Sequence, residues 1–126
     1  MSRKSRELKV EVKAVYLGEQ SHPEADRYTF AYTVTMQNTG TVAAKLLGRR
    51  WLITDANGKR MEVVGEGVVG EHPYLRPGEA FEYTSAATIE TPVGSMQGSY
   101  QLIADDGIPF EAPIEPFSLA IPRRLH

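Results

Sequence analysis

Apolar and polar residues alternate with a period of two along most of the chain, as expected for β-strands with one face in water. The clearest case is residues 27–38, where one face consists of Tyr28, Phe30, Tyr32, Val34 and Met36. Weaker alternation or extended composition predicts further strands over residues 8–17, 42–55, 59–64, 80–90, 95–105 and 108–122. No window shows a convincing 3.6-residue period, so the pattern predicts an all-β protein.

Glycine and proline mark the connections between these strands. Asn57-Gly58 predicts a two-residue type I′ hairpin, because both residue types tolerate a positive φ. Gly48 predicts a bulge or bend within residues 42–55, and Arg76-Pro77-Gly78-Glu79 predicts a tight turn with proline at its first central position. Prolines 109, 113, 116 and 122 place the last strand at a sheet edge or beside bulges, since proline lacks a ladder donor.

The length of 126 residues predicts one domain over residues 1–126, with a basic N-terminal arm at 1–7 and a short tail at 123–126. Its fold class is expected to be an immunoglobulin-like or fibronectin type III-like β-sandwich of about seven or more strands. Sandwiches of this kind often bury a tryptophan on a central strand and a tyrosine on a late strand. Trp51 and Tyr100 are the candidates for those two places.

Composition and charge exclude several classes of function. The chain has no cysteine, which removes disulfides, thiolate zinc sites and cysteine nucleophiles and is compatible with a cytoplasmic location. With a net charge of −2, the chain lacks the excess of lysine and arginine that a general nucleic-acid binder needs. No segment approaches the roughly 20 apolar residues that cross a bilayer, so membrane insertion is not expected.

The segment Gly65–Gly70 matches the letters of the dinucleotide-binding pattern GxGxxG. That pattern works only when a helix leaves the glycines, and here Pro73 and Pro77-Gly78 follow too closely for a helix. Two interpretations stay open. The backbone N–H groups could cup a pyrophosphate-like anion or nucleotide, with countercharges from Arg49, Arg50, Lys59, Arg60 and Arg76. Alternatively, the glycines only permit unusual dihedral angles and close packing.

Residues for catalysis or metal binding do not form a recognisable pattern. The three histidines, at positions 22, 72 and 126, lack metal-ligand spacing. Three acidic side chains could offer oxygen ligands to a divalent ion together with His72, namely Glu62, Glu66 and Glu71. Carboxylates on a protein surface are, however, usually just solvated. Ser85 and Ser95 have no neighbouring histidine and acid pair. We therefore expect no catalytic residues, no metal site, no cofactor and no enzymatic activity.

Several ordered segments resemble the ApaG family. They are YTFAYTVTMQN at 28–38, LLGRRWLITDANG at 46–58, EVVGEGVVGEHPYLRPGEAFEYTS at 62–85, TPVGSMQGSYQL at 91–102 and the closing PFSLAIP. The resemblance implies a fibronectin type III-like sandwich, found as a small bacterial protein and as a domain of some eukaryotic F-box and polymerase-interacting proteins. It also implies a link to cobalt and magnesium efflux or resistance. Two departures are Arg50, where members often carry histidine, and Ala86-Ala87, where they often carry Gly-Cys.

These observations favour a non-enzymatic protein-interaction module, linked to cobalt and magnesium homeostasis through a protein partner. The expected binding surface is the glycine-rich loop and its flanks, namely Gly65, Gly67, Gly70, His72, Tyr74 and Arg76. An exposed Tyr74 would suit a protein contact, while the alternative is that it folds back over the sandwich edge. Binding of pyrophosphate-like anions or nucleotides and direct divalent-cation binding are the alternative functions.

Overall fold

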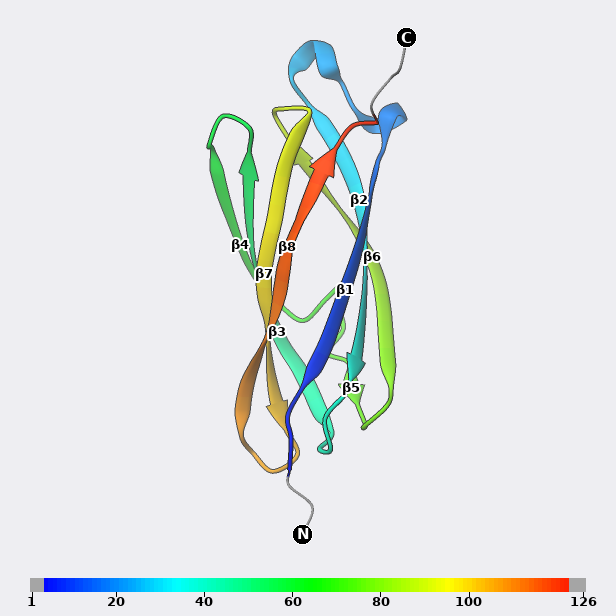
Figure 1. The fold of residues 1–126 in the computed structure, drawn as a ribbon, viewed down its shortest axis with the longest axis vertical. Helices are drawn as coiled ribbons and strands as arrows, with labels where there is room; N and C mark the ends of the chain where they lie inside the picture. Colours follow the sequence, from blue (N-terminus) through cyan, green and yellow to red (C-terminus); the bar gives the residue numbers. More distant parts are fainter. Residues whose placement is uncertain (1–3, 123–126) are drawn as a thin grey trace.

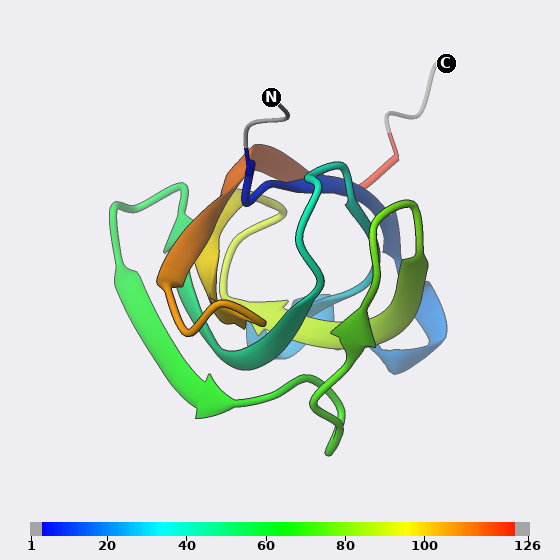
Figure 2. The same ribbon diagram turned by 90° about the horizontal axis from the view of Figure 1, so that it is seen from below.

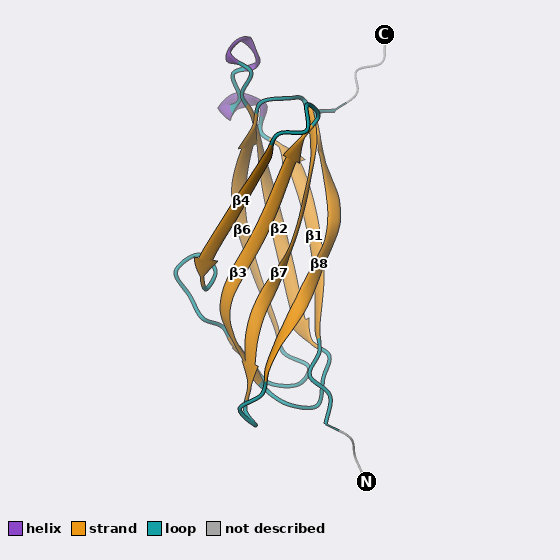
Figure 3. Ribbon diagram, turned by 90° about the vertical axis from the view of Figure 1, so that its left-hand side faces the viewer, coloured by secondary structure: helices purple, strands orange, loops and turns teal. Residues whose placement is uncertain are grey.

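Two antiparallel sheets pack face to face in the computed structural model, which describes residues 4–122 (Figure 1, Figure 3). The first sheet has three strands in the order β1-β2-β6, with bounds Leu8–Tyr16, Tyr28–Asn38 and Ala80–Ile89. The second has the order β4-β3-β7-β8, with bounds Arg60–Glu66, Ala44–Asp55, Val93–Ala104 and Pro109–Ala120. The predicted β-sandwich is confirmed.

A short strand, β5 (Tyr74–Leu75), pairs with the start of β3 and was not predicted. Two residues are too few to show any alternation, so only the pairing with β3 makes this segment a strand. The helical turns within residues 4–122 are η1 (Gly18–Gln20) and η2 (Pro23–Ala25). No helix in this part of the chain has the length and apolar character needed to span a membrane.

The core lies between the sheets and centres on Trp51, whose side chain is 2% exposed. Its ring makes edge-on contacts with Tyr32 of β2 at 5.3 Å, Phe117 of β8 at 6.0 Å and Tyr100 of β7 at 6.3 Å between centroids. Such edge-to-face pairs add to the free energy gained by burying the rings. The predicted burial of Trp51 and Tyr100 is confirmed.

One buried polar contact also joins the two sheets. The hydroxyls of Tyr83 on β6 and Tyr100 on β7 lie 2.5 Å apart and share a hydrogen bond. Burial raises the pKa of Tyr83 to about 12. Burial, followed by the neighbouring Tyr83, raises the pKa of Tyr100 further. Both hydroxyls therefore stay protonated in the folded protein at pH values where free tyrosine ionises.

The irregular strands agree with the glycine and proline signals. The β3–β7 register shifts between Leu46 and Gly48, which confirms the predicted bulge. Along β8 the partner changes from Ile114 opposite Gly98 to Phe117 opposite Met96, so Pro116 lies within a bulge of an edge strand. This placement removes the need for a ladder donor at the proline.

The hairpin between β3 and β4 is confirmed, but its predicted type I′ turn is wrong. Gly58 has a φ of 82°, whereas Asn57 is absent from the residues with positive φ, and type I′ needs both. The carboxylate of Asp55 accepts hydrogen bonds from the backbone N–H groups of Asn57 and Lys59, both at 2.9 Å. Asp55 thus stabilises a three-residue loop that requires only one left-handed residue.

The described part of the predicted basic arm docks on the sandwich. The backbone carbonyls of Ser5 and Glu7 accept hydrogen bonds from Thr41 and Thr39, and the Arg6 guanidinium pairs with Asp106. Residues 1–3 of the arm, the tail 123–126 and His126 lie outside the described residues.

The Tyr83–Tyr100 pair predicts loss of stability at alkaline pH. Above about pH 10 the unfolded chain releases these two protons while the folded protein keeps them, so the free energy of unfolding falls as pH rises toward the folded-state pKa values. Each hydroxyl contributes a slope of up to about 1.4 kcal/mol per pH unit. Urea denaturation at several pH values above 9 should show a shallower decline for the Tyr83→Phe, Tyr100→Phe double variant. Parallel curves for the two proteins would contradict this assignment.

Candidate functional site

The two long sides of the sandwich differ in how their edges are protected. On one side β1 and β8 lie next to each other, and β8 carries three prolines (Figure 1). On the other side the edges are β4 and β6, neither of which contains proline. The segment 67–73 leaves the end of β4 and projects from the body of the sandwich (Figure 2, Figure 3).

A groove of about 310 Å³ lies between β4 and β6. Met61 and Val63 line it from β4, and Ser85 and Ala87 line it from β6. The small side chains on β6 leave the space that a larger residue would fill. The remaining lining residues are Tyr32, Arg49, Trp51, Ile53, Ala86, Thr88 and Met96. A smaller cavity of about 60 Å³ adjoins it near the Lys59–Glu90 ion pair, whose N and O atoms are 2.5 Å apart.

Arg49 lies at one end of this groove. It shares the inward face of β3 with Trp51, and its Nη1 donates to the carbonyls of Glu66 at 2.9 Å and Gly67 at 2.8 Å. Its guanidinium covers Gly65 so closely that a Cβ there would lie 2.8 Å from three of its atoms. Gly65 therefore provides the space in which the Arg49 side chain sits.

The second half of the glycine segment forms a tight hairpin. Val68 and Glu71 exchange two backbone hydrogen bonds of 2.9 and 2.8 Å, and between them Val69 and Gly70 have φ values of 44° and 79°. Two successive positive φ angles are the requirement of a type I′ turn. Val68 is fully buried in the core, whereas Val69 is 55% exposed.

Gly67 fixes the position of this hairpin. Its φ is 59°, its N–H donates to Leu47 at 2.9 Å, and a Cβ would lie 2.3 Å from the carbonyl oxygen of Glu71. A side chain at this position is therefore excluded by both conformation and space.

The geometry of the segment does not favour an anion cup. The N–H groups of Gly67, Val68 and Glu71 already donate to backbone carbonyls. Two of the expected countercharges are paired with carboxylates, and Arg49, which does lie at the segment, already donates to the carbonyls of Glu66 and Gly67. Arg50 pairs with Glu62, and Lys59 pairs with Glu90.

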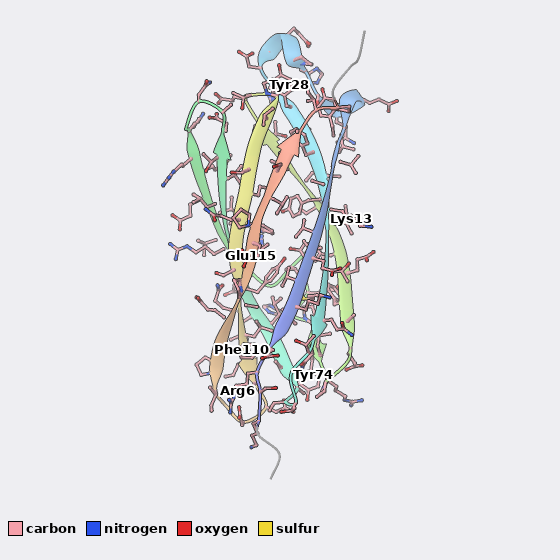
Figure 4. All side chains as sticks on the ribbon, in the orientation of Figure 1. Arg6, Lys13, Tyr28, Tyr74, Phe110 and Glu115 are labelled. Atoms are coloured by element: carbon pink, nitrogen blue, oxygen red, sulfur yellow. The ribbon has the colours of Figure 1, made fainter. Side chains whose placement is uncertain are left out.

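The other predicted site residues lie in two places. His72 lies beside the glycines, and its ring Nδ1 is 3.1 Å from the Leu46 carbonyl oxygen. In the tautomer that carries the proton on Nδ1, His72 donates a hydrogen bond to this carbonyl. Tyr74 lies at the same end of the sandwich as Arg6 and Phe110 (Figure 4). It is 47% exposed, and its hydroxyl donates to Asp105 at 2.6 Å, which raises the pKa of Tyr74. Arg76 opens the predicted 76–79 turn, whose Glu79 N–H donates to the Arg76 carbonyl.

The structure thus brings Gly65, Gly67, Gly70 and His72 together and leaves Tyr74 and Arg76 apart from them. Within residues 4–122, no three side chains of the types His, Asp and Glu gather as ligands for a metal ion. The groove and the inward-facing Arg49 were not predicted. The signal was the alternation along β3, because Arg49 has the same parity as Trp51 and Ile53.

Known proteins resemble this chain over its whole length. The family model described as the ApaG domain matches residues 18–104. Protein ApaG of Methylococcus capsulatus is 85% identical over 126 residues and covers 100% of both chains. Protein ApaG of Thiobacillus denitrificans is 58% identical over 123 residues, which are 98% of this chain and 97% of that protein.

The fold agrees with the sequence comparison. A crystal structure of an ApaA protein from Bordetella pertussis has a TM-score of 0.92 at 49% identity, covering 96% of this chain and 98% of that one. The resemblance seen in the sequence is therefore confirmed. The chain belongs to the ApaG family.

Proposed function

We propose that this protein is a non-enzymatic interaction module that binds an extended segment of a partner protein along the open edge of β4. The observation that carries the proposal is the combination of an unpaired strand edge with exposed apolar side chains beside it. Exposed edges accept an additional strand through main-chain hydrogen bonds, and flanking side chains give specificity.

Within residues 4–122, the edge of β4 that faces away from β3 pairs with no other strand. Hydrogen bonds from Asp55 to Lys59 and from Gly67 to Leu47 mark the two ends of the β3–β4 ladder. Because bonded and non-bonded pairs alternate in an antiparallel ladder, the odd-numbered residues of β4 direct their backbone groups to β3. The even-numbered residues direct theirs to the open edge. They are Arg60, Glu62 and Val64, followed by Glu66, whose carbonyl already accepts a hydrogen bond from Arg49.

Two exposed valines flank the edge. Val64 is 72% exposed within β4, and Val69 is 55% exposed at the tip of the following hairpin. Val69 is also held at a φ of 44°, a conformation that a β-branched residue rarely adopts. Strain of this kind occurs mainly at functional sites. It supports a role for the Val69 side chain in contacting the partner.

The partner would be a cytoplasmic protein that handles cobalt or magnesium, as the family's resistance label implies. The module would act on the ion through that protein rather than through ligands of its own. An anion cup in the glycine loop is less favoured, because the N–H groups of Gly67, Val68 and Glu71 already donate to backbone carbonyls. Direct binding of a divalent ion is less favoured too, because the described side chains do not gather into a ligand set.

Val69→Asn should raise the free energy of unfolding by about 1 kcal/mol, because asparagine tolerates a positive φ and Asn-Gly suits a type I′ turn. Urea denaturation measures the change. The matched control is Val64→Asn, which should leave stability unchanged or lower it, since Val64 has no positive φ. A loss of stability in Val69→Asn would show that its conformation carries no strain.

Val64→Pro should abolish partner binding while the sandwich stays folded, because the N–H that it removes faces the open edge. Tagged protein would be incubated with lysate of Methylococcus capsulatus, whose ApaG is 85% identical to this chain. Captured proteins would be quantified by mass spectrometry. We expect at least about a tenfold loss of captured partner, given the central hydrogen bond that is blocked.

Val64→Thr is the matched control, since it keeps the N–H and the branched shape and should retain most of the binding. Circular dichroism would establish that both variants are folded. Equal partner sets for wild type and Val64→Pro would refute binding at the β4 edge.

A further inference from the structure

We propose that the groove between β4 and β6 is a binding site for a small molecule with an apolar chain and a terminal carboxylate. This site is separate from the strand edge described above, because it lies between β4 and β6 and is lined by side chains of both sheets, whereas the strand edge is the backbone of β4 that faces away from β3. The carboxylate would pair with Arg49, and the chain would lie against Met61, Val63 and Ala87.

Arg49 carries the proposal, because it is a cation without an anionic partner. Within residues 4–122, ion pairs form at Arg6, Lys9, His22, Arg50 and Lys59, but none forms at Arg49. The side chain is only partly exposed and faces the space between the sheets. Enclosed charges are normally paired, so an anion in the groove would complete this site.

The geometry of Arg49 suits a carboxylate. Its Nη1 is engaged by the carbonyls of Glu66 and Gly67, which hold the guanidinium flat above Gly65. Nε and Nη2 have no hydrogen bond to another described residue. Nε and Nη2 are two parallel donors on one planar guanidinium held in place, and such a pair matches the two oxygens of a carboxylate.

The groove walls suit an apolar chain. Trp51, Ile53 and Met96 line it from the second sheet, and no acidic residue contributes to it. Its volume of about 310 Å³ falls at the small end of the range of ligand sites. The indole nitrogen of Trp51, one of the lining residues, is buried without an acceptor among residues 4–122.

Decanoate is a suitable probe, and Trp51 is a built-in reporter because it is the only tryptophan in the chain. Titration of the whole protein with decanoate, below the concentration at which it forms micelles, should change the Trp51 fluorescence with saturation. Decanol, which has the same chain without the charge, should bind at least about tenfold more weakly, since it loses a charge-assisted contact with Arg49.

Two variants test the position of the ligand. Ala87→Leu fills the groove from β6 and should weaken decanoate binding at least about tenfold, because the side chain takes the ligand's space. Thr84→Leu is the matched control on the outer face of the same strand, and it should bind like wild type. Arg49→Gln should reduce the affinity for decanoate to that for decanol.

The wild-type comparison decides the proposal even if a variant fails to fold. A linear or absent fluorescence change with decanoate would overturn it, as would equal affinities for decanoate and decanol. Equal decanoate binding by folded Ala87→Leu would also overturn it by showing that the ligand lies elsewhere.

Discussion

The packing of Trp51 against Tyr32, Tyr100 and Phe117 is the contact on which the rest of the structure depends. It joins β3 to a strand of the opposite sheet and to two strands of its own sheet, with centroid distances between 5.3 and 6.3 Å. The Tyr83–Tyr100 hydrogen bond lies in the same layer and links β6 to β7. Once these rings are packed, the alternation of each strand determines which side chains enter the core.

That packing closes the sandwich unevenly. On one side β1 and β8 lie against each other, whereas Ser85 and Ala87 leave the side between β4 and β6 open. The parity of β3 that buries Trp51 also turns Arg49 inward, at the point where the groove begins. The groove, the unpaired β4 edge and the projecting hairpin therefore share one side of the molecule.

The glycines of the GxGxxG pattern at Gly65–Gly70 have a different role in this β-sandwich than in a dinucleotide-binding fold. Gly65 makes room for the Arg49 guanidinium, Gly67 allows a close backbone approach, and Gly70 completes a turn. None of these roles needs a helix or a phosphate. Val69 differs from the glycines, because its backbone conformation is unfavourable for valine and its side chain stays exposed.

The sequence alone determined the strands, the buried Trp51 and Tyr100, the bulge at Gly48 and the family, because period-two alternation and ordered motifs are local properties of the chain. It could not predict β5, whose two residues become a strand only by pairing with β3. It also misassigned the Asn57-Gly58 turn, since the Asp55 carboxylate selects a different loop. The groove and the lack of an ion pair at Arg49 among residues 4–122 were decided by tertiary structure alone, because both depend on which strands become edges and what faces them across the two sheets.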